Sequence, residues 1–222
     1  MSAQQPMTAQ ETKEQLLWVA QEMLHSGLVE GTAGNVAARL PDGNAVLTPS
    51  SLDYRSMGLD DLVVCDLDGN VVEGHRSPTT EKSLHLSALR LYPEIGATMH
   101  CHAKFATMFA LTRQPIPAVI EEFDVFVGGD VEVAEYRTTG TEELAAEVAA
   151  RVAKKAAVLM ANHGLFAVGK TPKDVLHVAG LVERTAEIVH GARAMGAVVP
   201  LPDAVNQQFA GYYRFGRTGS FD

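Results

Sequence analysis

The 222-residue chain has two cysteines, one tryptophan and few aromatic residues of any kind, which make up 6% of the sequence. Cys65 and Cys101 each stand inside an apolar stretch, so we expect a reducing compartment and no disulfide framework. The chain has no basic run and a formal net charge of −9, which argues against nucleic acid or an anionic membrane as a partner. It also lacks an apolar leader in residues 1–11 and any run of about 18 apolar residues, which predicts a cytoplasmic protein without a membrane span.

Apolar residues make up 46% of the sequence, which is enough for one sizeable core in a chain of this length. We therefore expect a single domain over residues 1–222, with a flexible N-terminus at 1–8. Residues 198–222 are rich in proline and then in aromatic side chains, which favours a tail docked on the domain, near the active site. The acidic total does not exclude an anionic substrate, because a metal and backbone N–H groups can make a local positive pocket.

Helical and strand patterns are mixed along the chain. Thr8 and Glu11 form a capping-box pattern, and Thr171, Pro172 and Asp174 are strong helix-start residues. The predicted helices cover residues 8–27, 77–93, 103–111, 141–154 and 171–195. Predicted hairpins and strands fall at 31–51, 62–72, 95–102, 116–120, 125–133, 156–160 and 165–168. This mixture indicates an α/β domain whose largely antiparallel sheet has helices on both faces.

Three histidines stand where apolar runs end. His100 and His102 alternate along one strand and therefore share a face, whereas Met99 and Cys101 point to the other face. His163 lies in a glycine-containing turn after a second apolar run. A single histidine in such a strand is more often a hydrogen-bonded core residue, but two on one face with a third nearby favour a metal site with an open coordination position. The other five histidines show no such grouping and are interpreted as structural: His25, His75, His85, His177 and His190.

Glu81 is the strongest candidate acid, because it stands at a helix start beside Thr79 and Thr80. Free N–H groups at such a start can bind phosphate. The alternative is that a threonine is an ordinary cap and Glu81 a first-turn acid favoured by the helix dipole. The short polar side chains that could join a phosphate site are Asn35, Ser50, Ser51, Thr79 and Thr80. The segment 31–35 lacks the spacing of a dinucleotide or P-loop fingerprint.

Six segments, taken in order, resemble the class II aldolase/adducin family: GTAGNV (31–36), LTPSS (47–51), SPTTEKSLH (77–85), MHCHAKFATMFA (99–110), GTEELA (140–145) and ANHGL (161–165). The resemblance extends over about residues 14–213. It implies a three-layer α/β/α sandwich around a central, mostly antiparallel sheet. It also implies a homotetramer with one metal site per subunit near each interface, which would hold zinc or another divalent metal.

The resemblance also implies roles for individual residues. His100, His102 and His163 would be the zinc ligands, and Glu81 would ligate the free metal and then act as acid/base. Asn35, Ser50, Ser51, Thr79 and Thr80 would hold the substrate phosphate, with Thr32 and Gly34 shaping the loop and Tyr212 or Tyr213 acting from the tail. The implied reaction is reversible cleavage of a ketose phosphate, such as L-fuculose 1-phosphate, to dihydroxyacetone phosphate and an aldehyde through a metal-stabilised enediolate.

Two departures from the family pattern leave alternatives open. Ser50 and Ser51 replace a threonine and a glycine, and Thr79 and Thr80 replace paired serines. The acidic stretch Glu121, Glu122 and Asp124 stands where a tyrosine is expected. A sugar-phosphate 4-epimerase, a dehydratase or a decarboxylase would use the same kind of site. A non-catalytic, adducin-like interaction domain is a different reading, but such a domain should lack the histidines and Glu81.

Overall fold

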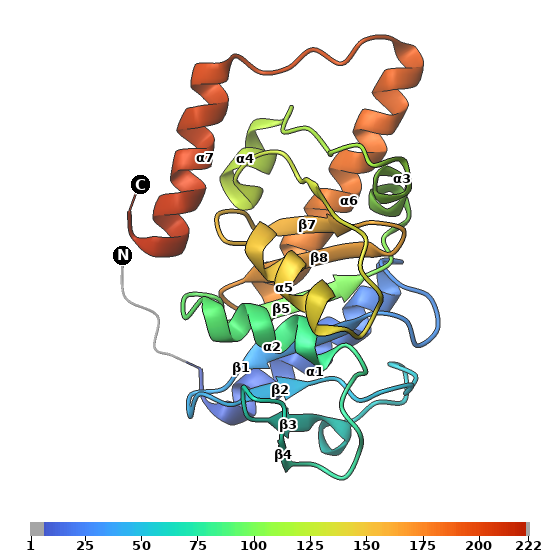
Figure 1. Ribbon diagram of the computed structural model, residues 1–222, viewed down its shortest axis with the longest axis vertical. Helices are drawn as coiled ribbons and strands as arrows, with labels where there is room; N and C mark the ends of the chain where they lie inside the picture. The colour runs from blue at the N-terminus through green and yellow to red at the C-terminus, as the bar shows by residue number, and fades with distance from the viewer. Residues whose placement is uncertain (1–6, 221–222) are drawn as a thin grey trace.

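A central sheet of eight strands organises the computed structural model, which describes residues 7–220 (Figure 1). The strand order is β4-β3-β2-β1-β5-β8-β7-β6. Every pairing is antiparallel except that of β6 with β7, so the mostly antiparallel sheet is confirmed. The strands are β1 Asn35–Arg39, β2 Ala45–Leu47, β3 Val63–Cys65, β4 Val71–Glu73, β5 Ala97–Cys101, β6 Val133–Ala134, β7 Ala157–Met160 and β8 Gly164–Gly169.

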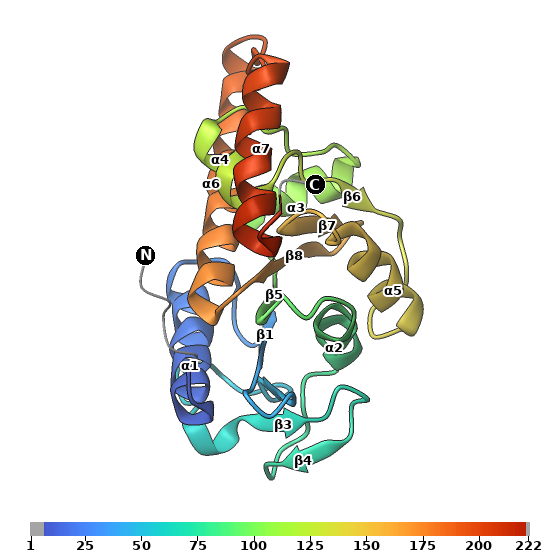
Figure 2. The same ribbon diagram turned by 90° about the vertical axis from the view of Figure 1, so that its left-hand side faces the viewer.

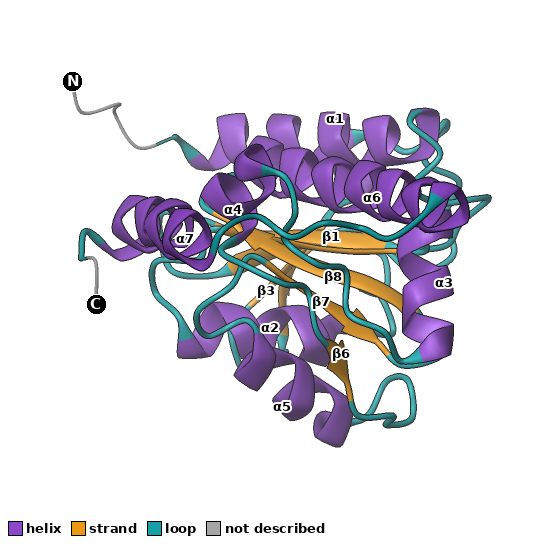
Figure 3. Ribbon diagram, turned by 90° about the horizontal axis from the view of Figure 1, so that it is seen from above, coloured by secondary structure: helices purple, strands orange, loops and turns teal. Residues whose placement is uncertain are grey.

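Helices cover both faces of this sheet, which confirms the three-layer sandwich. α1 and α6 lie on one face and α2 and α5 on the other (Figures 2 and 3). Alternation along β5 sends Met99 and Cys101 into the core beneath α1 and α6, as predicted. The helices are α1 Ala9–His25, α2 Lys82–Leu91, α3 Lys104–Thr112, α4 Glu121–Val127, α5 Glu142–Arg151, α6 Pro172–Met195 and α7 Asp203–Thr218, with a 3-10 turn at Leu59–Asp61.

The predicted helix starts are confirmed for the first and the longest helix. Thr8 and Glu11 form a capping box at the start of α1, and Thr171 and Asp174 form another at the start of α6. Of the N-terminus expected to be flexible at 1–8, residues 1–6 lie outside the described residues. None of the helices formed by residues 7–220 has both the length and the apolarity that crossing a membrane requires.

The strand predicted over 125–133 is wrong, because residues 121–127 form α4. Glu121, Glu122 and Asp124 lie in its first turn, where carboxylates interact favourably with the helix dipole. Gly128 then ends the helix in a left-handed conformation with φ +88°. The strand predicted over 116–120 is reduced to one bridge between Ile116 and Val131.

The C-terminal tail contains a helix, α7, that the sequence patterns did not predict. It packs against α4, and the Tyr213 ring fills the space beside Gly128. Arg217 forms an ion pair with Glu94 at 3.0 Å and donates to the Val152 carbonyl at 2.7 Å. Glu94 and Val152 precede β5 and β7, whereas His100 lies near the far end of β5. Figures 1 and 3 both place α7 and α3 at opposite edges of the molecule, so the tail is docked but not beside His100, His102 and His163 of its own chain.

Candidate metal centre

The structure brings the three predicted ligand histidines together at one end of the sheet. His100 lies on β5 and is fully buried, His102 follows the strand, and His163 lies in the turn between β7 and β8. One ligand atom from each histidine lies within 4.8 Å of the others, and the Nε2 atoms of His100 and His102 are 3.1 Å apart. Such convergence of imidazole nitrogens is the geometry of a chelate.

The protonation of these imidazoles suits metal binding. His100 Nδ1 donates to the Leu165 carbonyl at 3.1 Å, so its Nε2 lone pair faces the cluster. Burial, followed by the neighbouring imidazoles of His163 and His102, holds the pKa of His100 well below its usual value. Burial also lowers the pKa of His102 and of His163. Neutral imidazoles are the form that a metal requires.

Glu81 completes the cluster. Its Oε2 lies 3.4 Å from His100 Nε2, and its Oε1 lies 3.5 Å from His163 Nε2. Oε1 is buried and has no hydrogen-bond partner among residues 7–220, although a buried unpaired carboxylate oxygen is costly. Three neutral imidazoles and this oxygen therefore fit a divalent cation such as zinc. The Glu81 side chain makes no cap hydrogen bond to α2; its two oxygens lie beside His100 and His163 instead.

Residues from distant segments hold the histidine-bearing backbone in place. The carboxylate of Glu183 on α6 accepts from the N–H groups of Phe105 and Ala106 at 2.9 and 2.8 Å, which caps α3 directly after His102. Arg113 donates to the side chain of Asn162, whose backbone is left-handed with φ 56°. This contact fixes the turn that presents His163. No sequence pattern indicated either contact, because each partner lies far away along the chain.

His85, which the sequence pattern left outside the grouped histidines, is also part of the site's surroundings. It is fully buried. Its Nε2 lies 2.5 Å from Asn35 Oδ1, and its Nδ1 lies 2.7 Å from Thr98 Oγ1. Asn35 Nδ2 in turn donates to Glu81 Oε2 at 2.9 Å. The only signal in the sequence was the four-residue spacing from Glu81, which puts two side chains on one helix face.

The loops with the candidate phosphate-binding residues are joined beside the histidines. Backbone bonds link Ser50 with Ser77 at 3.0 Å and Thr79 with Thr48 at 3.1 Å. Gly34 approaches the sheet so closely that a Cβ there would lie 2.8 Å from the His100 carbonyl oxygen. Thr32, Ser51 and Thr80 are exposed, Gly34 and Ser50 are half-buried, and Asn35 and Thr79 are buried. The loops thus offer hydroxyl groups at the edge of the site.

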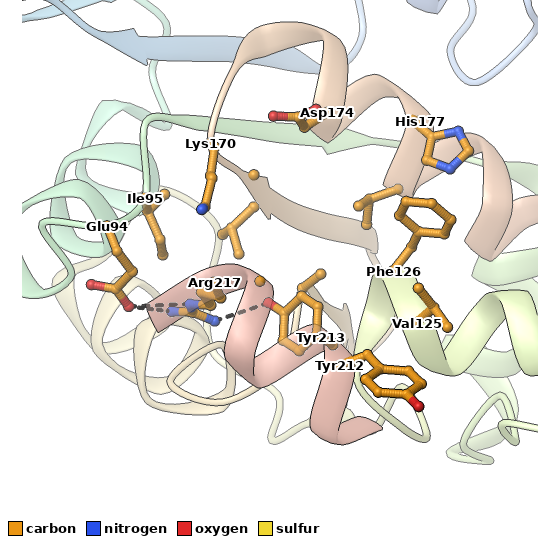
Figure 4. Close-up of a pocket in the computed structure, with 15 residues that line it drawn as sticks. Glu94, Ile95, Val125, Phe126, Lys170, Asp174, His177, Tyr212, Tyr213 and Arg217 are labelled. Carbon is orange, nitrogen blue, oxygen red and sulfur yellow. Dashed lines mark hydrogen bonds and ion pairs between the residues drawn. The ribbon is translucent and has the colours of Figure 1, made fainter. Parts of the chain in front are cut away.

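The tail tyrosines and the acidic residues of α4 lie elsewhere in the chain. Tyr213 lines a cavity of about 400 Å³ between α7 and β8, and its hydroxyl accepts from Arg217 at 3.1 Å (Figure 4). Tyr212 is 45% exposed. Glu122 pairs with Arg184 at 3.6 Å, and Asp124 is fully buried. Among the described residues, no hydrogen bond or ion pair joins these side chains to the histidines.

Known proteins resemble this chain over most of its length. The family model described as "Class II Aldolase and Adducin N-terminal domain" matches residues 14–190. The 5-deoxy-D-ribulose 1-phosphate aldolase of Bacillus thuringiensis is 33% identical and covers 93% of this chain and 99% of its own. An L-ribulose-5-phosphate 4-epimerase of Salmonella paratyphi B is 31% identical and covers 90% of this chain and 94% of its own. The solved structure of an L-fuculose 1-phosphate aldolase matches with a TM-score of 0.88 at 34% identity, and the match covers 94% of this chain and 99% of that chain.

Proposed function

Because the chain belongs to the class II aldolase and adducin family, we propose that it is a zinc-dependent aldolase that cleaves a ketose 1-phosphate to dihydroxyacetone phosphate and an aldehyde. The observation that carries this proposal is the position of Glu81, whose unpaired Oε1 faces the three-histidine cluster. The relatives named as aldolases of 5-deoxy-D-ribulose 1-phosphate and L-fuculose 1-phosphate support the substrate class.

Each residue of the site has a defined task in this mechanism. His100, His102, His163 and Glu81 would hold the metal. When bound, the metal supplies Lewis-acid stabilisation of the negative charge that develops as the carbon–carbon bond breaks. Glu81 Oε1, as a carboxylate, would take the proton of the substrate hydroxyl that becomes the aldehyde and, as the carboxylic acid so formed, would deliver it to the carbon that the cleavage leaves; the reverse reaction runs the same two transfers backwards.

Binding of the substrate phosphate is assigned to the joined loops. Thr32, Gly34, Asn35, Ser50, Ser51, Thr79 and Thr80 form this set. Hydroxyl groups at the start of α2 suit a phosphate dianion, whereas the N–H groups of Thr79, Glu81 and Lys82 already donate within the protein. The exposed hydroxyl groups of this set can contact the substrate phosphate directly, whereas the Asn35 amide already bonds to Glu81 and His85.

We further propose a cytoplasmic homotetramer with its sites at subunit interfaces. Met108 and Leu111 on α3, the helix that follows His102, are 38% and 53% exposed, and a second subunit would cover them. α7 lies away from His100, His102 and His163 of its own chain, so Tyr212 or Tyr213 would act in a neighbouring subunit's site. The two cysteines are free and buried, which fits a reducing compartment.

The test measures aldehyde release from a panel of phosphorylated ketoses. The protein is loaded with one equivalent of zinc and incubated with L-fuculose 1-phosphate, 5-deoxy-D-ribulose 1-phosphate and L-ribulose 5-phosphate. We expect aldehyde and dihydroxyacetone phosphate from at least one ketose 1-phosphate, and no release after chelation. Turnover that continues undiminished in metal-free protein contradicts the mechanism.

A 4-epimerase is the second candidate, because one relative carries that name. Epimerisation needs a further acid/base, and the α4 carboxylates of the same subunit do not reach the cluster. Formation of D-xylulose 5-phosphate from L-ribulose 5-phosphate, without aldehyde release, would favour the epimerase. Zinc binding without turnover of any tested ketose phosphate would favour an interaction domain.

A further inference from the structure

Three buried polar side chains connect the middle of the sheet to Glu81. Thr98 on β5 and His85 on α2 are fully buried, and Asn35 on β1 is 5% exposed. Thr98 Oγ1, the His85 ring, the Asn35 amide and Glu81 Oε2 form an unbroken hydrogen-bond chain with distances of 2.7, 2.5 and 2.9 Å. The chain comes from three separate elements and ends on the carboxylate of the proposed metal site.

The acceptor at its end fixes the direction of every bond in this chain. An ionised carboxylate can only accept, so Asn35 must turn Nδ2 to Glu81 and Oδ1 to His85. His85 must then carry its proton on Nε2, which leaves Nδ1 to accept from the Thr98 hydroxyl. All donors thus point toward Glu81. With its hydrogen on Nδ1, His85 could not donate to Asn35 Oδ1, and this order of donors and acceptors would break.

We propose that His85 is a positioning residue that, through Asn35, orients the Glu81 carboxylate. Anchoring Oε2 leaves Oε1 directed at the histidine cluster. This inference rests on the proposed role of Glu81 in the metal site. Burial lowers the pKa of His85 to about 3, so the ring stays neutral and the donor pattern holds throughout the neutral pH range.

A purely structural role explains these contacts less well. The His85 ring packs 5.6 Å from the Phe166 ring in the apolar core beneath α2 and α5. Apolar side chains could fill that space without polar groups that require burial and pairing. The expense of burying these polar groups is understandable if the chain serves the carboxylate at its end, because partners of metal ligands orient them and tune their affinity.

A double-mutant cycle on zinc affinity tests the proposal without relying on turnover. Zinc dissociation constants are measured by competition with a chromophoric chelator for the wild type, His85→Leu, Glu81→Ala and the double variant. We expect His85→Leu to weaken zinc binding roughly 10- to 100-fold when Glu81 is present. In the Glu81→Ala background, the same substitution should have no further effect. His85→Gln, whose amide can still donate to Asn35, should recover most of the affinity.

A milder pair covers the case in which His85→Leu does not fold. Thr98→Val removes the hydroxyl at nearly constant shape, and Thr98→Ser retains it. We expect Thr98→Val to weaken zinc binding when Glu81 is present and not in the Glu81→Ala background, and we expect Thr98→Ser to bind zinc like the wild type. Equal weakening in both Glu81 backgrounds overturns the positioning role while leaving the proposed function intact. A wild type that binds no zinc overturns both proposals.

Discussion

At the scale of single residues, the two oxygens of Glu81 have different surroundings. Oε2 accepts from Asn35, whereas Oε1 is buried without a hydrogen bond from any residue of 7–220. One oxygen is therefore held and the other is available to a metal or a proton. The histidines alone offer three nitrogen ligands, so metal retention and proton transfer should be separable at this position.

We predict that Glu81→Gln retains zinc and loses most of its turnover. The three imidazoles still hold the metal, but an amide cannot shuttle a proton, and general acid–base catalysis contributes typically about 10²- to 10⁴-fold. Metal analysis and kcat measured on the same preparation check this. The control is Glu143→Gln at an exposed position on α5, which should keep both. Full activity in Glu81→Gln would remove Glu81 from the chemistry.

We predict that Asp124→Asn stabilises the protein above pH 6. Burial, with a smaller contribution from Asp130, raises the pKa of Asp124 from 3.8 to about 6. The folded chain therefore binds more protons than the unfolded chain between these values, and its stability falls as pH rises through this window. The variant lacks this loss, so its free energy of unfolding should exceed that of the wild type by roughly 1–2 kcal/mol at pH 7.5.

Urea denaturation at pH 4 and pH 7.5 measures this difference. The difference in the free energy of unfolding should shrink at pH 4, where the Asp124 carboxyl of the folded wild type is largely protonated. Asp60→Asn, at an exposed carboxyl, is the matched control. If Asp124→Asn raised the free energy of unfolding by the same amount at both pH values, this account would be contradicted.

At the scale of elements, the pairing of β1 with β5 determines where His100 lies beside Asn35 and the loop before β1. Asn35 pairs with His100 across these strands, and Gly34 precedes β1 with φ +73°. A Cβ at Gly34 would meet Val29 Cγ1 at 2.6 Å and the His100 carbonyl oxygen at 2.8 Å. The close approach of this loop to β5 therefore requires glycine for both its backbone angle and its lack of a side chain.

We predict that Gly34→Ala is more destabilising than Gly43→Ala and that it alone weakens zinc binding. Both glycines have positive φ, but a Cβ at Gly43 meets nothing within 4 Å. The control should lose about 1–2 kcal/mol from its left-handed backbone, and Gly34→Ala should lose roughly 1–3 kcal/mol more from overpacking against β5. Chemical denaturation and chelator competition measure the two effects. Equal losses would show that the clash with β5 relaxes freely.

At the scale of the whole molecule, the proposed metal site joins parts of the chain that are far apart in sequence. Its side chains come from the start of α2, the end of β5 and the turn after β7. A metal that binds this folded arrangement and not the unfolded chain stabilises the fold by mass action.

We predict that saturating zinc raises the Tm and that chelation reverses the rise. At about 100 times the dissociation constant, binding adds about 2.7 kcal/mol, which corresponds to roughly 5–10 °C for a chain of this size. His163→Ala should lose most of the shift. His75→Ala, an exposed histidine in a loop, should keep it. A zinc-dependent rise that is undiminished in His163→Ala would place the metal elsewhere.

The sequence by itself determined the layers of the fold and the side chains at the centre of the site. Alternation along β5 put His100 and Cys101 on opposite faces, and cap residues marked the starts of α1 and α6, because both signals are local. Only the tertiary structure decided what depends on distant contacts: α4 in place of a strand, the docking of α7 away from the histidines, and the chain from Thr98 through His85 to Glu81. Hydrogen bonds between separate elements leave no periodicity in the sequence, and folding alone brings their partners together.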